Sequence, residues 1–161
     1  MAEGEFALVK DYLEAAGKMP VSSRGFLMNE TERYFLLADV AVIERDEVAL
    51  SQYAPLAEEM ALRDDHLLFQ ASAHRAWGVL HRLTDKYEEA KDRLNQALEI
   101  FEELDTRWQI GRTLYELAEL AVARADLTEA HGYYSRALVT FEEMGAKPDA
   151  VRTRKALGSR D

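Results

Sequence analysis

Four histidines are the side chains of this chain best suited to bind a metal, because it contains no cysteine. His74 and His81 are separated so that they lie two turns apart on one face of a helix. Zinc proteases carry a closer pair in an HExxH motif, which this sequence lacks. His66 and His131 have no evident partner. We therefore interpret His74 and His81 as core-facing structural residues and predict that the chain binds no metal.

Two pairs of adjacent acids, Glu102 with Glu103 and Glu142 with Glu143, resemble the carboxylates of general acid–base catalysis. Adjacent helical residues point about 100° apart, so neither pair converges on a substrate, and we expect solvated faces. GxxxxGK[ST], GxGxxG after a strand and GxSxG are absent from the sequence. We predict no catalytic residue, no cofactor and no enzymatic activity. An enzyme whose site is assembled from residues distant in sequence is the least favoured alternative.

Composition favours an all-helical protein, because Ala, Leu and Glu are plentiful and the 161 residues include three prolines and eight glycines. No long apolar run and no secretion signal is present, so neither a membrane partner nor export is predicted, and a cytoplasmic location is expected. The formal net charge of −10 disfavours nucleic acid as a partner.

The helices are expected from a repeated pattern. YEEAKDRLNQALEIFEEL, residues 87–104, recurs forty residues later as LTEAHGYYSRALVTFEEM. Apolar or small residues in each copy follow the 3,4 spacing of an amphipathic helix. Asp85 with Glu88, and Asp126 with Glu129, predict an N-cap before each copy. A further helical pattern precedes each turn, at residues 65–83 and 106–124. The repeating unit is therefore helix, turn, helix.

The ends of the array are less regular. A more divergent copy covers residues 29–63, and the start of a fourth unit covers residues 148–158. Val151 and Leu157 of this last helix are expected to face the preceding repeat, so that it acts as a cap. FALVKDYLEAAG predicts a separate helix that ends at Gly17. We divide the chain into an N-terminal helix and linker, 1–25, and a repeat domain, 26–161, with about three repeats and a half-repeat.

These repeats resemble the tetratricopeptide repeat family, in the longer form of about forty residues found in bacterial regulators and signalling ATPases. Small residues at the family's contact positions carry the resemblance: Gly78, Ala90 and Ala97 in one copy, and Ala118, Ala130 and Ala137 in the next. The resemblance implies a short right-handed α-solenoid. It departs from the family pattern at His74 and Leu114, where a large aromatic is expected.

The resemblance also implies a concave wall, lined by the first helix of each repeat, that binds another protein. The positions carried over as a binding groove are Phe35, Asp39, Arg75, Val79, Arg82, Arg112, Tyr115, Glu119, Arg152 and Lys155. Glu32, Val42, Ser72 and Val122 share this face. The arginines predict an acidic partner segment, with Tyr115 and Val79 as an apolar floor. Internal pairing of these arginines with neighbouring acids is the competing interpretation.

We therefore predict a non-catalytic scaffold that binds a protein or peptide segment in the concave groove. A regulatory or dimerisation segment of a larger bacterial signalling or transcription-regulatory protein is the alternative. It is suggested by the unpaired first helix and the half-repeat at the end, and a homodimer is consistent with it.

Overall fold

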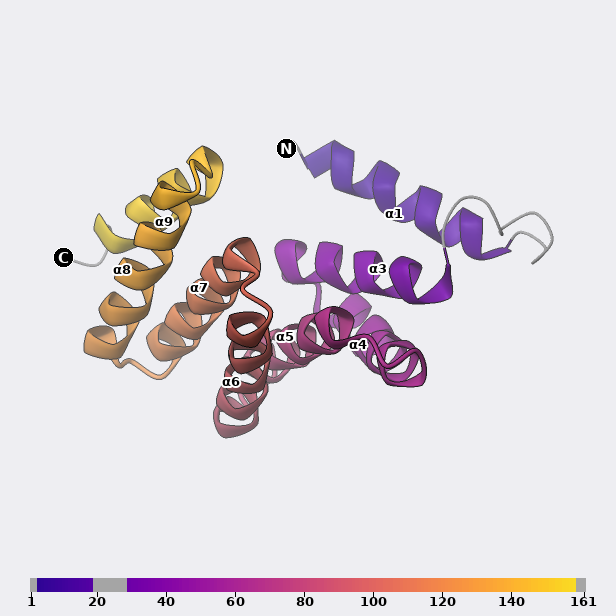
Figure 1. Ribbon diagram of the computed structural model, residues 1–161, viewed down its shortest axis with the longest axis horizontal. Helices are drawn as coiled ribbons and strands as arrows, with labels where there is room; N and C mark the ends of the chain where they lie inside the picture. Colours follow the sequence, from indigo (N-terminus) through magenta and orange to yellow (C-terminus); the bar gives the residue numbers. More distant parts are fainter. Residues whose placement is uncertain (1–2, 19–28, 159–161) are drawn as a thin grey trace.

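A computed structural model describes residues 3–18 and 29–158, which form eight α-helices and no strand (Figure 1). The helices are α1 (Glu3–Lys18), α3 (Glu30–Glu44), α4 (Glu47–Arg63), α5 (Leu67–Leu83), α6 (Tyr87–Glu103), α7 (Arg107–Ala123), α8 (Leu127–Glu143) and α9 (Lys147–Gly158). The predicted all-α class and the helix-turn-helix units are confirmed. None of these helices is both long enough and apolar enough to pass through a bilayer.

The turns between α3 and α9 all use the same backbone geometry. One residue in each of these six turns has a positive φ, and these residues recur every twentieth position: Arg45, Asp65, Asp85, Asp105, Ala125 and Gly145. The N–H of the following residue then donates to the carbonyl five residues back, as from Asp46 to Ala41 at 3.1 Å and from Ala146 to Phe141 at 2.9 Å. This closure satisfies the last carbonyls of each helix. Identical turns make each hairpin a copy of its neighbour.

The predicted N-caps differ in outcome. The carboxylate of Asp126 accepts from the backbone N–H of Glu129 at 2.9 Å, as expected. The prediction for Asp85 is wrong, because Asp85 has a φ of 59° in the turn and its carboxylate accepts from the hydroxyl of Tyr87 instead. Asn29 forms a complete capping box with Glu32 at the start of α3. Spacing alone therefore did not distinguish a cap from the turn residue before it.

The hairpins stack into an arc, with α3, α5, α7 and α9 on its inner side and α4, α6 and α8 on its outer side (Figure 1). Small residues lie where the two helices of a hairpin cross. A Cβ on Gly78 of α5 would approach Leu94 Cγ of α6 to 2.5 Å, and one on Gly111 of α7 would approach Phe141 Cε1 of α8 to 2.7 Å. Larger side chains would overpack these crossings.

Helix α1 packs on the first repeat, formed by α3 and α4, at the N-terminal end of the arc. Leu13 is 2% exposed and joins the core that α3 and α4 share with α5. Lys10 Nζ lies 3.3 Å from Asp46 Oδ2, and the hydroxyl of Tyr53 donates to Glu14 Oε1 at 2.8 Å. The helix extends to Lys18, beyond the predicted end at Gly17. The linker residues predicted after it lie outside the described residues.

Helix α9 packs on α8 at the opposite end. Ala150 and Thr153 are buried against the preceding repeat, and Leu157 is half-buried. The prediction that Val151 faces this repeat is wrong, because Val151 is 62% exposed. Ala150, one residue earlier, takes the inward position.

Candidate partner-binding wall

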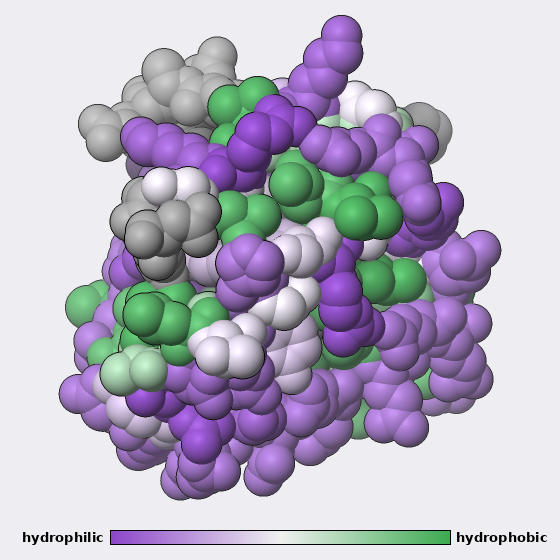
Figure 2. All heavy atoms as spheres, turned by 90° about the vertical axis from the view of Figure 1, so that its left-hand side faces the viewer, coloured by the Kyte–Doolittle hydropathy of each residue, from purple (hydrophilic) through white to green (hydrophobic). Residues whose placement is uncertain are grey.

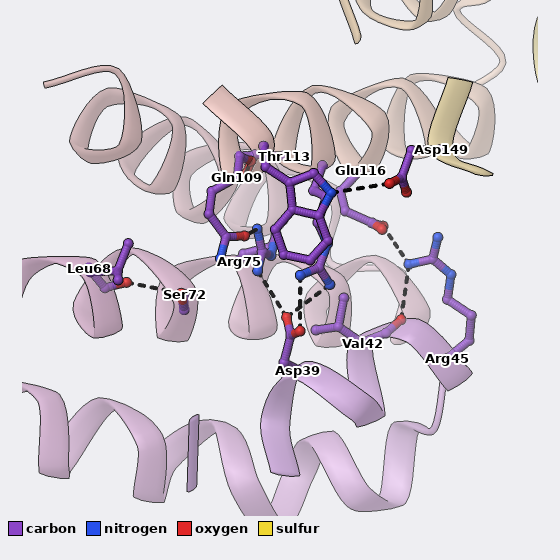
Figure 3. A network of polar contacts seen from close by, with 12 residues as sticks. Asp39, Val42, Arg45, Leu68, Ser72, Arg75, Gln109, Thr113, Glu116 and Asp149 are labelled. Carbon is purple, nitrogen blue, oxygen red and sulfur yellow. Dashed lines mark hydrogen bonds and ion pairs between the residues drawn. The ribbon is translucent and has the colours of Figure 1, made fainter. Parts of the chain in front are cut away.

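The centre of the inner wall holds one carboxylate between two arginines (Figure 3). Asp39 of α3 accepts a hydrogen bond from Arg75 Nη2 of α5 at 2.9 Å and another from Arg112 Nη1 of α7 at 2.9 Å. Arg75 Nη1 donates to Gln109 Oε1 at 2.6 Å. Arg75 is 1% exposed, and its Nε finds no partner among the described residues. A single aspartate thus links the first helices of three consecutive repeats.

A second carboxylate is shared in the same way. Glu116 of α7 lies 2.5 Å from Arg45 Nη1, at the C-terminal end of α3, and 3.4 Å from Arg82 Nη2 of α5. Glu116 is 5% exposed, and the Nε of Arg82 is another buried nitrogen with no partner in the described part of the chain. These two clusters, named here the arginine wall, contain four arginines and two carboxylates. The arginine wall therefore has a formal charge of +2 in a chain of −10.

Burial and neighbouring charge act in opposite directions on these groups. Burial alone would raise the pKa of the Asp39 carboxyl, but the charges of Arg112 and Arg75 outweigh it and hold that pKa below its usual value. At Glu116, burial again acts to raise the pKa, but the charges of Arg45 and Arg82 outweigh it, so this pKa is also lowered. Burial, together with Arg112, lowers the pKa of Arg75 to about 10. Both carboxylates are therefore ionised at neutral pH, and so is Arg75.

The edge of this wall toward α9 is more accessible. Trp108 is 42% exposed. The guanidinium carbon of Arg112 lies 4.7 Å from the Trp108 ring centroid, and Trp108 Nε1 donates to Asp149 Oδ2 at 3.1 Å. The guanidinium carbon of Arg152 lies 4.2 Å from the ring centroid of Tyr115. Aromatic and cationic side chains thus alternate along this edge.

The structure brings most of the predicted groove residues onto one wall but leaves few of them accessible. Val79 is fully buried and Tyr115 is 8% exposed, so neither provides a broad apolar floor. Phe35 is half-buried, with its ring centroid 4.8 Å from that of Phe69, and Glu119 accepts from the hydroxyl of Tyr134. Of the predicted groove residues, Arg152 and Lys155 are exposed.

The histidine pair lies on the outer side of α5. His74 Nδ1 is 2.8 Å from Arg93 Nη1, and burial, followed by the charge of Arg93, lowers the pKa of His74. The ring centroids of His81 and Trp77 are 5.4 Å apart. Both imidazoles are half-buried rather than fully buried. Among the described residues, no three His, Asp or Glu side chains are grouped so that they could hold a metal ion.

Comparison with known proteins agrees with this geometry. Residues 69–143 match the tetratricopeptide repeat family model. Residues 69–143 therefore carry tetratricopeptide repeats, as the repeat pattern predicted. No curated protein matches the chain.

A solved structure with a similar fold is that of a Rap protein complexed with Competence and Sporulation Factor. The two share 18% sequence identity and superpose with a TM-score of 0.74. The alignment covers 98% of this chain and 50% of the Rap chain, so this chain spans about half the length of that protein. At this level of identity the similarity supports the solenoid fold.

Proposed function

We propose that this chain is a non-catalytic scaffold that binds an acidic segment of a partner protein at the α7–α9 edge of the inner wall. The observation that carries the proposal is the charge of the arginine wall. Four arginines face two carboxylates there, although acids outnumber bases in the chain as a whole. An approaching carboxylate would offset this surplus positive charge, and it would be attracted before contact.

Accessible side chains next to the arginine wall would make the contact itself. Arg152 and Lys155 of α9 are exposed, and Trp108 presents a half-exposed indole beside Arg112. Arginine can grip a carboxylate through two parallel hydrogen bonds, and an indole can cover the apolar part of a partner side chain. Arg75 and Arg112 then act from beneath, as buried charges that orient and attract, rather than as direct contacts.

Family and fold support the class of function. Tetratricopeptide repeats form stacked hairpins whose inner wall is a natural binding surface. The Rap protein of similar fold was solved as a complex with another factor. We extend only the property of binding a partner to this chain, and we propose neither a catalytic site nor a cofactor for it.

A titration tests this proposal. Three labelled peptides of equal length and equal apolar content would carry Glu, Gln or Lys at their polar positions. We expect the Glu peptide to bind most tightly, to quench the fluorescence of Trp108, and to weaken as salt rises to about 1 M, where screening acts within about 3 Å. Tight binding of the Gln or Lys peptide would contradict the proposal.

Charge reversal on α9 tests where the peptide binds. Arg152→Glu combined with Lys155→Glu should weaken binding of the Glu peptide by at least about tenfold. Arg63→Glu combined with Arg136→Glu is the matched control, because it makes the same change in net charge on α4 and α8, away from the inner wall. If both double variants weaken binding equally, the attraction is a property of the whole surface and the proposed edge is wrong.

A second candidate is a regulatory or dimerisation segment of a larger protein. It is favoured by one observation, that 98% of this chain aligns with only half of the Rap chain. This candidate predicts that the acidic peptide does not bind. The same titration therefore separates the two functions.

A further inference from the structure

Helix α1 occupies the position of a second helix, and no first helix precedes it among the described residues. It runs antiparallel to α3 (Figure 1), and its contacts Lys10–Asp46 and Glu14–Tyr53 advance in the same direction along α4. Second helices of adjacent repeats are tied together in the same manner elsewhere. Lys91 Nζ of α6 lies 2.8 Å from Glu129 Oε1 of α8. Helix α1 therefore extends the outer layer by one helix.

The far side of α1 carries exposed apolar side chains beside the exposed Asp11. Leu8 is 72% exposed and Tyr12 is 58% exposed, and Ala15 continues the same stripe at 3,4 spacing. The second helix α6 differs, because its exposed positions between residues 88 and 103 are acidic or amide side chains. In α6 the apolar stripe Ala90, Leu94 and Ala97 is instead fully buried. The exposed stripe of α1 thus has the spacing of a stripe that other repeats bury.

Helix α9 is in the opposite situation: it packs as a first helix, and no second helix covers it among the described residues. Gly158 takes the place of Gly78, yet a Cβ there would meet no described atom within 4 Å, whereas one at Gly78 would meet Leu94. Val151 takes the place of Gly111, which packs on Phe141, and is 62% exposed. The side of α9 that a second helix would cover is open.

A hollow of about 320 Å³ lies beside this open side, between α8 and α9. It is lined by Leu127, Thr128, Ala130, His131, Tyr134, Ala156 and Leu157. Figure 2 shows apolar side chains among polar ones on the end of the molecule that α8 and α9 form. One repeat earlier, the place of His131 is held by Lys91, which pairs with the next second helix. The hollow therefore lies where a further second helix would pack.

From these two ends we infer that the chain associates end to end, with α1 of a second copy packed on α9 and over the hollow beside it. That helix would supply the second half of the fourth repeat and would bury Leu8 and Tyr12 against Val151 and Leu157. The charges are complementary as well. By sequence, α9 carries four basic and one acidic side chain, whereas α1 carries four acidic and two basic.

Such a contact joins two different surfaces, so it leaves one free end on each copy and propagates unless the array closes. This distinguishes it from a symmetric dimer made by two α1 helices. The measurement is the weight-average mass from sedimentation equilibrium, over a range of concentrations up to about 1 mM, which reaches weak contacts. We expect the mass of the wild type to exceed that of one chain and to rise with concentration.

Two single variants block the two surfaces separately. Tyr12→Glu places a charge in the stripe of α1, and Val151→Glu places one on the open side of α9. Each should hold the chain at the mass of one copy. Val48→Glu on α4 is the control, because Val48 is 80% exposed and belongs to neither surface, so it should leave association unchanged. Circular dichroism checks that all three variants keep their helical content.

The decisive experiment mixes the two blocked variants. Tyr12→Glu retains a functional α9 and Val151→Glu retains a functional α1, so an equimolar mixture should form a complex of two chains and stop there. The inference is overturned if the wild type stays at the mass of one chain, or if the folded mixture does not pair. Loss of association by Tyr12→Glu but not by Val151→Glu would also overturn it in favour of an α1–α1 dimer.

Discussion

At the scale of single residues, the dominant feature is Arg75, a guanidinium that is 1% exposed in the centre of a small protein. Removing such a charge from water is costly, and its attraction to Asp39 has to compensate. Asp39 also serves Arg112, so one carboxylate holds two cations in place. The arrangement is therefore sensitive to loss of the Asp39 carboxylate. Arg75 and Arg112 are also poorly placed to leave Asp39 for the carboxylate of a partner.

Asp39→Asn should lower the free energy of unfolding by about 3–5 kcal/mol, because it leaves two largely buried arginines without their counterion. Urea denaturation followed by circular dichroism measures this change. Glu143→Gln is the matched control, because Glu143 pairs with Arg107 on the exposed surface. It should change stability by less than about 1 kcal/mol. Similar effects of the two substitutions would show that the arginine wall contributes no more than a surface pair.

Acid should destabilise the fold through the same carboxylates. The folded-state pKa values of Asp39 and Glu116 are lowered, so their contribution is present above the unfolded-state pKa values of about 4 and is lost as pH falls through the folded-state values. We expect the free energy of unfolding to decrease from about pH 4 downward. Glu116→Gln should flatten this dependence. A variant whose pH profile keeps the wild-type slope would exclude Glu116 as a source of it.

At the scale of elements, the repeated turn is the unit that sets the hairpin geometry. Five of the six turns between α3 and α9 place a residue with a Cβ at positive φ. This conformation costs roughly 1–2 kcal/mol for most side chains and is tolerated best by Gly, Asn and Asp. Three turns use Asp and one uses Gly, but Arg45 and Ala125 have no such advantage. These two turns therefore retain strain that the neighbouring packing holds.

Ala125→Gly should raise the free energy of unfolding by about 1 kcal/mol, because glycine adopts the φ of 59° there without steric cost. The reverse change in the next turn, Gly145→Ala, should lower stability by a similar amount, since Gly145 has a φ of 68°. Thermal or urea unfolding of both variants measures the pair. Changes of opposite sign in the free energy of unfolding would support the view that the two turns are equivalent. Changes of the same sign would contradict that view.

Packing within a hairpin gives a second prediction at this scale. Ala130→Leu should lower the free energy of unfolding by about 1–3 kcal/mol, because Ala130 is 2% exposed and a larger side chain overpacks the crossing of α7 and α8. Glu102→Ala should change it by less than about 0.5 kcal/mol, since Glu102 is half exposed and its ion pair with Arg136 measures 3.6 Å. Equal losses would show that the register of the second helices is wrong.

At the scale of the whole molecule, stability passes from each repeat to the next, because each hairpin buries its apolar face on its neighbours. Ala150, Ala156 and Leu157 of α9 cover the cluster that contains Tyr134 and Phe141. Deleting residues 148–161 should therefore lower the melting temperature and cause aggregation. Adding Tyr12→Glu to the truncated chain should not prevent this aggregation, because the core that the deletion exposes is a different surface from the proposed α1 contact. A truncated chain that remains monomeric and equally stable would show that α9 is not a cap.

The sequence by itself determined the helices, their pairing into hairpins and most of the buried small residues. Ala90, Ala97 and Ala137 are fully buried where the repeat pattern placed them. This information is local, because the 3,4 spacing of apolar residues and the turn every twenty residues are properties of short segments. A pattern repeated in register then fixes the stacking of neighbouring hairpins.

The tertiary structure alone decided which charges meet. Asp39 and Arg112 lie 73 residues apart and come together because the curvature of the arc brings side chains of α3 and α7 within reach of each other across α5. No periodicity within a repeat specifies that curvature, so the sequence left internal pairing and partner binding as competing interpretations for the arginines. Val151 is a smaller case: it takes the place of Gly111, which faces the second helix of its own repeat, and it is exposed because no described second helix covers α9.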